Sequence, residues 1–182
     1  SASVVPSRRG NVILTAAHCI IDPETGTVAT EHSVVFIPGY RNGVAPYGTW
    51  EAAKESFATT ESWAKAARGG PRPNEGGDLA LVTLEVNKES ENAHRGENVE
   101  RVVGSLGIAF DRACGQAYTQ YGYPAESPYD GESLYFQAVA YAGTDTNSAI
   151  SPKPVKIASD FTRGSSGGPW TIGSSEEPTV LS

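Results

Sequence analysis

The chain has 182 residues, 38% hydrophobic and 19% charged, with 20 glycines, 12 prolines and a formal net charge of −7. These proportions exclude a disordered chain, and a negative charge without any lysine or arginine run excludes the usual nucleic-acid binder. No apolar run approaches the ~18 residues that a membrane span needs. The length predicts one domain or two small ones, and the frequent glycine and proline favour short strands joined by turns.

The first half of the chain predicts a hairpin, further strands and one short helix. Apolar residues at 3–5 and 12–17 flank a Gly10-Asn11 turn, which is the arrangement of a β-hairpin. Residues 60–68 predict a helix with Thr60 as its N-cap and Gly69-Gly70 at its end. The other segments, in chain order, are a strand at 34–37, a stretch at 49–58 that fits either a helix or a strand, and an alternating strand at 79–86.

The second half predicts more strands after a polar segment. Residues 87–100 are charged and show no periodicity, so we interpret them as a linker between two domains, residues 1–98 and 99–182. Strands are expected at 117–123, 134–142 and 155–158, and Val180 and Leu181 begin what would be another. Short strands separated by turns predict an all-β fold of the sandwich or barrel type.

The first segment with catalytic chemistry is Thr15-Ala16-Ala17-His18-Cys19, in which a histidine ends an apolar strand. Imidazole has an unperturbed pKa near neutrality, so His18 is a candidate general base. Taken alone, the same pattern also fits a histidine that merely closes a strand.

The second segment is Gly77-Asp78-Leu79-Ala80-Leu81, in which a carboxylate directly precedes a buried strand. Asp78 is a candidate partner for the Nδ1–H of His18, where it would fix the tautomer and stabilise the imidazolium. An ordinary turn aspartate before a strand gives the same pattern.

The third segment is Gly164-Ser165-Ser166-Gly167-Gly168-Pro169. It lies between two apolar runs, which argues against a flexible linker. Ser166 is the candidate nucleophile, and the amides of Gly164 and Ser166 are candidate oxyanion donors, since glycine lets the backbone approach closely. The same residues also match the G-x-S-x-G nucleophile elbow of α/β-hydrolases. Those enzymes place the catalytic histidine after the serine, however, and no histidine follows Ser166.

In the order His, Asp, Ser, the segments TAAHC, GDLAL and GSSGGP resemble the trypsin/chymotrypsin-like serine peptidases. The stretches VVFIPGYRNGVAPYGTW and YGYPAESPYDG are similar to a secreted bacterial branch related to glutamyl endopeptidases. The resemblance implies two antiparallel six-stranded β-barrels, truncated at both ends here, with His18 and Asp78 in the first and Ser166 in the second. It also implies a secreted serine endopeptidase that acts on polypeptides through this triad and an acyl-enzyme intermediate.

Within the resemblance, three positions need separate treatment. Ser165 stands where most trypsin-like enzymes carry an aspartate that receives the new N-terminus, so activation of that kind is not expected. The resemblance implies that Cys19 is half of a disulfide whose partner lies before Ser1. Cys114 is then left without an assigned partner, and a buried free thiol is favoured over a Cys19–Cys114 bond.

Cleavage specificity is only partly readable. Asp160 lies six residues before Ser166, where trypsin carries its pocket aspartate, although a plain loop aspartate is the alternative. If Asp160 lines the pocket, charge pairing favours cleavage after Arg or Lys. Glutamyl specificity in related enzymes uses a histidine after the serine, and no histidine stands between Ser166 and the last residue of this sequence.

The sequence predicts no cofactor and no metal site, because His18-Cys19 is too small a cluster and His32 and His94 lie in polar, solvated contexts. We expect a monomer that binds neither nucleic acid nor a membrane. The alternative function is a catalytically silent trypsin-like binding protein. His18, Asp78, Ser166 and Gly164 are all present, which argues against it.

Overall fold

The computed structural model describes residues 1–71, 73, 75–88, 92–110, 112–113, 115–146, 153–172 and 179–181. The strands in chain order are β1 (Ser3–Val5), β2 (Val12–Thr15), β3 (Val35–Phe36), β4 (Trp50–Thr59), β5 (Ala80–Leu84), β6 (Gly107–Ala109), β7 (Tyr118–Gly122), β8 (Tyr135–Val139), β9 (Tyr141–Thr144), β10 (Val155–Ile157), β11 (Trp170–Ile172) and β12 (Thr179–Leu181). The helices are α1 (Glu61–Ala66) and α2 (Val99–Val103), and the 3-10 turns are η1 (Ala17–Cys19), η2 (Glu31–Ser33) and η3 (Glu75–Gly77).

The first sheet has the strand order β1-β2-β5-β4-β3. The predicted hairpin is confirmed, because β1 and β2 pair antiparallel with Ser3 opposite Leu14. Alternation in β5 buries Ala80, Val82 and Leu84 and leaves Leu81 exposed, as a strand with one face on a core requires. These side chains pack with the fully buried Trp50 in the main hydrophobic core.

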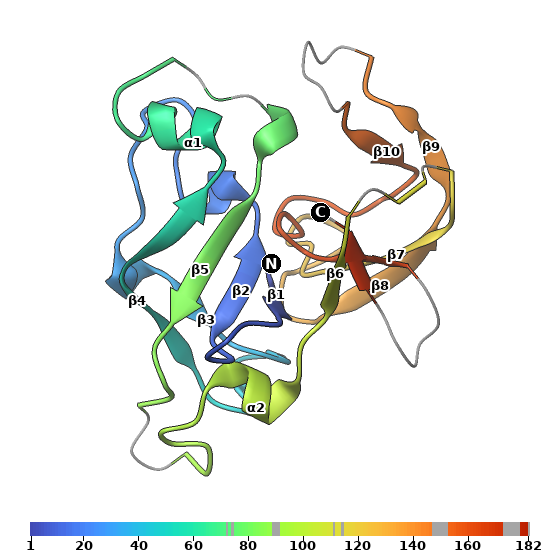
Figure 1. The fold of residues 1–182 in the computed structure, drawn as a ribbon. Coiled ribbons are helices and arrows are strands. Elements are labelled where there is room, and N and C mark those ends of the chain that lie inside the picture. The colour runs from blue at the N-terminus through green and yellow to red at the C-terminus, as the bar shows by residue number, and fades with distance from the viewer. Residues whose placement is uncertain are drawn as a thin grey trace.

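The chain after α2 forms a second five-stranded sheet, with the order β6-β12-β11-β7-β8, and a two-stranded ribbon of β9 and β10. Figure 1 shows the two large sheets side by side, with the N-terminal strand β1 between them. The mostly β architecture is therefore confirmed. Each large sheet has five strands among the described residues, so the expected count of six in each barrel is not shown. The division at residues 98 and 99 stays a prediction.

Two local expectations are resolved by tertiary contacts. The ambiguous stretch at 49–58 is strand β4, because Phe57 and its neighbours pair with β5. Thr60 does occupy the N-cap position of α1, but its hydroxyl does not cap the helix. That hydroxyl donates instead to the Gly77 carbonyl at 2.6 Å.

The segment interpreted as a linker packs against the first sheet where the structure describes it. Asn87 is 1% exposed, and its amide donates to the Glu97 carbonyl at 3.1 Å. That carbonyl also accepts from Nε1 of the buried Trp50 at 3.0 Å. Helix α2 follows directly and buries Val99 in the core, so both ends of this polar stretch pack against the first sheet.

Candidate active site

The backbone after β2 turns sharply and exposes His18. Ala16 is extended, and η1 then closes through hydrogen bonds from the amides of Ile20 and Ile21 to the Ala17 carbonyl. Ala17 is completely buried in the core, whereas the His18 side chain is 39% exposed. Burial of one small residue therefore anchors the turn and directs its neighbour toward solvent.

The register of two strands brings Asp78 to His18. Strands β2 and β5 are antiparallel, with Thr15 at the end of β2 opposite Ala80 at the start of β5. Residues just after β2 and just before β5 therefore lie at the same end of the pair. The sequence places His18 and Asp78 in these two positions, although they are far apart in the chain.

Asp78 contacts His18 through both carboxylate oxygens. The His18 backbone amide donates to Oδ1 at 2.8 Å, and Nδ1 of the ring lies 2.6 Å from Oδ2. A carboxylate only accepts, so the proton of a neutral His18 ring lies on Nδ1 and leaves the Nε2 lone pair free. The pKa of His18 is raised from 6.5 to about 10, mainly by the hydrogen bond to Asp78 and next by a hydrogen bond to Cys19.

The raised pKa makes a testable prediction. We expect an NMR titration of the His18 ring protons to give a pKa well above 6.5, and a lower value in Asp78→Asn, which removes the charged acceptor. Because the folded-state pKa lies above the unfolded value, stabilisation by the pair is complete below pH 6.5 and is lost as the pH rises toward about 10. A titration unchanged by Asp78→Asn would contradict the pairing.

Two glycines shape the loop that carries Ser166. Gly164 and Gly167 have φ values of 97° and 76°, in the left-handed region that favours glycine. A Cβ at Gly164 would lie 2.5 Å from the Tyr123 carbonyl oxygen, so the loop packs directly on the segment after β7. Ser165 closes the loop from within, since its Oγ donates to the Thr162 carbonyl at 2.7 Å.

The Ser166 loop also lies against the segment that carries His18. A Cβ at Gly167 would lie 2.5 Å from the Ser1 carbonyl oxygen and 2.7 Å from the Ala16 amide nitrogen. The amine of Ser1 donates to the Ser166 carbonyl at 2.7 Å, and the thiol of Cys19 lies 4.0 Å from that oxygen. The structure therefore brings all three sequence-predicted segments together where the two large sheets meet.

Asp160 is exposed and lies close to Tyr129, whose ring in turn contacts Tyr135 and Phe161. The ring centroids of Tyr129 lie 4.8 Å from Tyr135 and 5.9 Å from Phe161, both edge-on. Burial, and then the charge and hydrogen bond of Asp160, raise the pKa of Tyr129. This group of aromatic side chains could not be predicted from local sequence patterns, because its members come from separate loops and strands.

The expected disulfide has no support in the part of the chain that is described. Cys19 is an exposed free thiol there, and Cys114 lies outside the described residues.

His32 is 84% exposed at its side chain, as expected for a solvated residue. His94 is only one-third exposed, and its Nδ1 lies 3.0 Å from Glu97 Oε2, so this histidine has a hydrogen-bond partner and is not the solvated residue that was expected.

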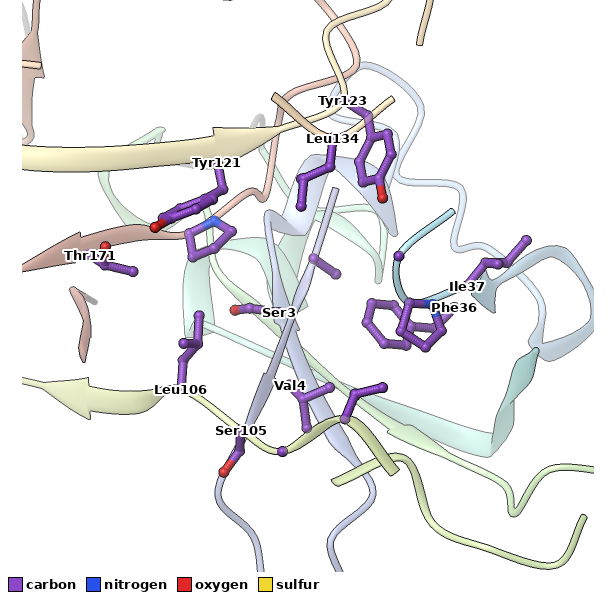
Figure 2. A pocket seen from close by; sticks show the side chains of 16 residues that line it. Ser3, Val4, Phe36, Ile37, Ser105, Leu106, Tyr121, Tyr123, Leu134 and Thr171 are labelled. Atoms are coloured by element: carbon purple, nitrogen blue, oxygen red, sulfur yellow. The ribbon is translucent and has the colours of Figure 1, made fainter. Parts of the chain in front are cut away.

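Two cavities, of about 350 and 400 Å³, lie between the sheets, and neither is lined by the residues of the candidate site. Figure 2 shows the first, with Ser3 and Val4 of β1 in its wall, Phe36 on one side and Tyr121 on the other. The second reaches Cys19 and Ser1. The candidate catalytic side chains therefore lie outside the walls of these two cavities.

The described residues contain no cluster of three or more histidine, cysteine or acidic side chains arranged to hold a metal ion. None of the helices in the described ranges has both the length and the apolar character needed to cross a membrane.

Comparisons with known proteins identify the family. Protease Anisep from Arthrobacter nicotinovorans is 31% identical, with a TM-score of 0.79 over 98% of this chain and 73% of its own. A thermostable serine protease, AL20, from an extremophilic microorganism is also 31% identical, with a TM-score of 0.78 over 98% of this chain and 74% of its own. No family profile and no curated protein matches. With this identity and coverage, and with the mostly β fold described above, the chain belongs to the trypsin-like serine proteases.

Proposed function

We propose that the protein is a serine endopeptidase in which Ser166, His18 and Asp78 form a catalytic triad. The observation that carries the proposal is the 2.6 Å contact between His18 Nδ1 and Asp78 Oδ2, beside the loop that bears Ser166. A neutral ring with its proton on Nδ1 has Nε2 available as the base for the serine hydroxyl. Only the neutral ring can accept that proton, so we expect kcat/KM to rise with pH as free His18 deprotonates.

The geometry of two peptide units supports Gly164 and Ser166 as oxyanion donors. The Arg163 carbonyl accepts from the Ala125 amide at 2.6 Å, and the Ser165 carbonyl accepts from the Gly168 amide at 3.0 Å. In a planar trans peptide the N–H points opposite to the C=O. The amides of Gly164 and Ser166 therefore point away from Ala125 and Gly168, which leaves both available to one developing negative charge.

The proposed reaction follows from these roles. Ser166 Oγ forms a bond to the scissile carbonyl carbon while its proton passes to His18 Nε2, and the carbonyl π electrons move to the oxygen. The amides of Gly164 and Ser166 stabilise this oxyanion. Collapse breaks the C–N bond as His18 protonates the leaving amine, and water then repeats the sequence on the acyl-enzyme. Asp78 stabilises the imidazolium in both halves.

Asp160 is the proposed basis of substrate preference. Its exposed carboxylate, close to Tyr129, provides a negative charge that attracts a cationic side chain. We therefore propose cleavage after Arg or Lys. Neither solved neighbour is named as a glutamyl endopeptidase, so that narrower branch rests on the sequence motifs alone.

The test of function and preference is digestion of a denatured polypeptide, with every product identified by mass spectrometry. We expect new termini inside the polypeptide, mostly after Arg or Lys, and loss of that preference in Asp160→Asn, which keeps the shape but removes the charge. Release of single residues from the ends would contradict an endopeptidase. Internal cuts whose distribution is the same in Asp160→Asn would contradict the role of Asp160 alone.

The remaining expectations extend the same proposal. A polypeptide substrate follows from membership of a protease family. Secretion and a monomeric state are proposals that rest on the sequence resemblance.

A further inference from the structure

Two loops from different sheets are joined by three hydrogen bonds, which we call the inter-sheet clasp and define by Tyr40, Asn42, Tyr123 and Glu132. The Tyr40 hydroxyl donates to Glu132 Oε2 at 2.8 Å, and the Tyr123 hydroxyl donates to the Tyr40 carbonyl at 3.0 Å. The Asn42 amide donates to the Glu132 carbonyl at 2.9 Å. Tyr40 and Asn42 lie between β3 and β4, whereas Tyr123 and Glu132 lie between β7 and β8.

The local backbone presents these groups in fixed positions. Asn42 and Gly43 have φ values of 47° and 78°, and Arg41 and Val44 form an antiparallel bridge across them. Asn-Gly favours a tight turn with two left-handed residues. On the opposite loop, the Gly131 amide donates to the Pro124 carbonyl at 2.8 Å, which closes the loop before Glu132.

The tyrosine hydroxyls of the clasp remain donors over a wide pH range. The hydrogen bond to Glu132 is the largest cause that raises the pKa of Tyr40, and burial raises the pKa of Tyr123. Both side chains are partly buried, and their ring centroids lie 6.4 Å apart. Both hydroxyls therefore stay protonated up to the pH at which an ordinary tyrosine ionises, and the clasp keeps its donors over that range.

The segment that the clasp fixes is the same one that orients the Gly164 amide. Two residues after Tyr123, the Ala125 amide donates to the Arg163 carbonyl, and so sets the direction of the Gly164 N–H. The Tyr123 backbone amide donates to Ser1 Oγ at 3.1 Å, and that hydroxyl donates to the Gly164 carbonyl at 3.0 Å. Both peptide units that flank Gly164 are thus bonded to the neighbourhood of Tyr123.

We propose that the inter-sheet clasp is a positioning device, which aligns the Gly164 amide and the Ser166 loop on the histidine-bearing sheet. The inference rests on the proposed function of Ser166. None of the clasp residues belongs to the proposed triad or supplies a proposed oxyanion donor. They act by restraining the segment that directs the Gly164 amide. If that restraint is lost, the oxyanion donor is misaligned, which reduces stabilisation of the transition state more than binding of the substrate.

The test uses the double variant Tyr40→Phe/Tyr123→Phe, which removes two hydroxyls and keeps both rings. We expect kcat for a short peptide and the rate of Ser166 labelling by a fluorophosphonate to fall roughly tenfold, with KM within about twofold of wild type. Glu132→Gln retains an acceptor oxygen for Tyr40, so it should keep a rate close to wild type, whereas Glu132→Ala should not.

The matched control is Tyr47→Phe, on the same loop as Tyr40 but in ring contact with His94 at 6.4 Å. Its kcat should match wild type. A wild-type kcat in the double variant would overturn the proposal, and so would an equal loss of kcat in Tyr47→Phe. A loss of kcat/KM that comes entirely from a higher KM would overturn it as well. A wild-type protein that is not labelled at Ser166 would instead contradict the proposed function, which separates the two failures.

Discussion

Ser166→Ala is expected to lower kcat for peptide hydrolysis by roughly 10⁶-fold, the size of loss that follows removal of the serine from a triad protease. The variant deletes the only atom proposed to attack the carbonyl carbon. It should leave the fold intact, because the contacts from Ser1 to Ser166 and Gly164 involve backbone carbonyls, which alanine retains. The rate of peptide hydrolysis checks the loss of kcat, and thermal unfolding of the same preparation checks that the fold is intact.

The adjacent serine provides the matched control. Ser165→Ala removes the hydrogen bond from Ser165 Oγ to the Thr162 carbonyl, and should reduce the free energy of unfolding by about 1 kcal/mol. Hydrolysis should persist in this variant. Wild-type hydrolysis by Ser166→Ala, together with its loss in Ser165→Ala, would show that the nucleophile has been assigned to the wrong serine.

Asp78→Asn is expected to lower kcat by about 10⁴-fold, as the equivalent change does in the known Ser-His-Asp triads. The carboxylate accepts from both the ring and the backbone amide of His18. An asparagine amide group can donate to Nδ1, which favours the tautomer with a proton on Nε2 and removes the base. Steady-state kinetics should show the loss in kcat, with little change in KM.

Asp22→Asn is the control for this change. Asp22 also accepts backbone amides, from Glu24 and Thr25 at 2.8 and 2.9 Å, but in a surface turn. Asparagine retains an acceptor there, so kcat should stay near wild type. A wild-type kcat in Asp78→Asn at the same pH would contradict the role of Asp78 in orienting and charging His18.

The sequence predicted the components of the site because each lies next to an element with a strong pattern. His18 follows a buried strand and Asp78 precedes another, and antiparallel pairing of β2 with β5 is enough to bring them together. Ser166 was recognisable from its glycines, two of which do adopt positive φ. Local patterns thus identified the residues, whereas the distances between them depended on strand register.

Other features of the fold depended on contacts that a local pattern does not contain. The polar segment before α2 carries no apolar periodicity, yet Trp50 bonds the Glu97 carbonyl and Val99 enters the core. Thr60 matched an N-cap preference, but the nearby Gly77 carbonyl competes successfully for its hydroxyl. Both differences arise because a partner that is distant in sequence but close in space outweighs a local preference that is weak in isolation.

The inter-sheet clasp could not be predicted for a related reason. Tyr40 and Glu132 are separated by 92 residues, and both stand in turn-rich sequence with no repeating pattern. Only the packing of the two sheets brings their loops together. The aromatic rings of Tyr129, Tyr135 and Phe161 likewise become neighbours through the fold and not through spacing in the chain.

The most direct test of the central claim is fluorophosphonate labelling of the folded protein, with the modified residue located by mass spectrometry. A triad that is assembled as proposed predicts one adduct on Ser166 of the wild type, and its loss in His18→Ala at the same pH. A folded wild-type chain that gives no adduct, or one on another residue, would contradict the account. Absence of any adduct would favour the catalytically silent binding protein.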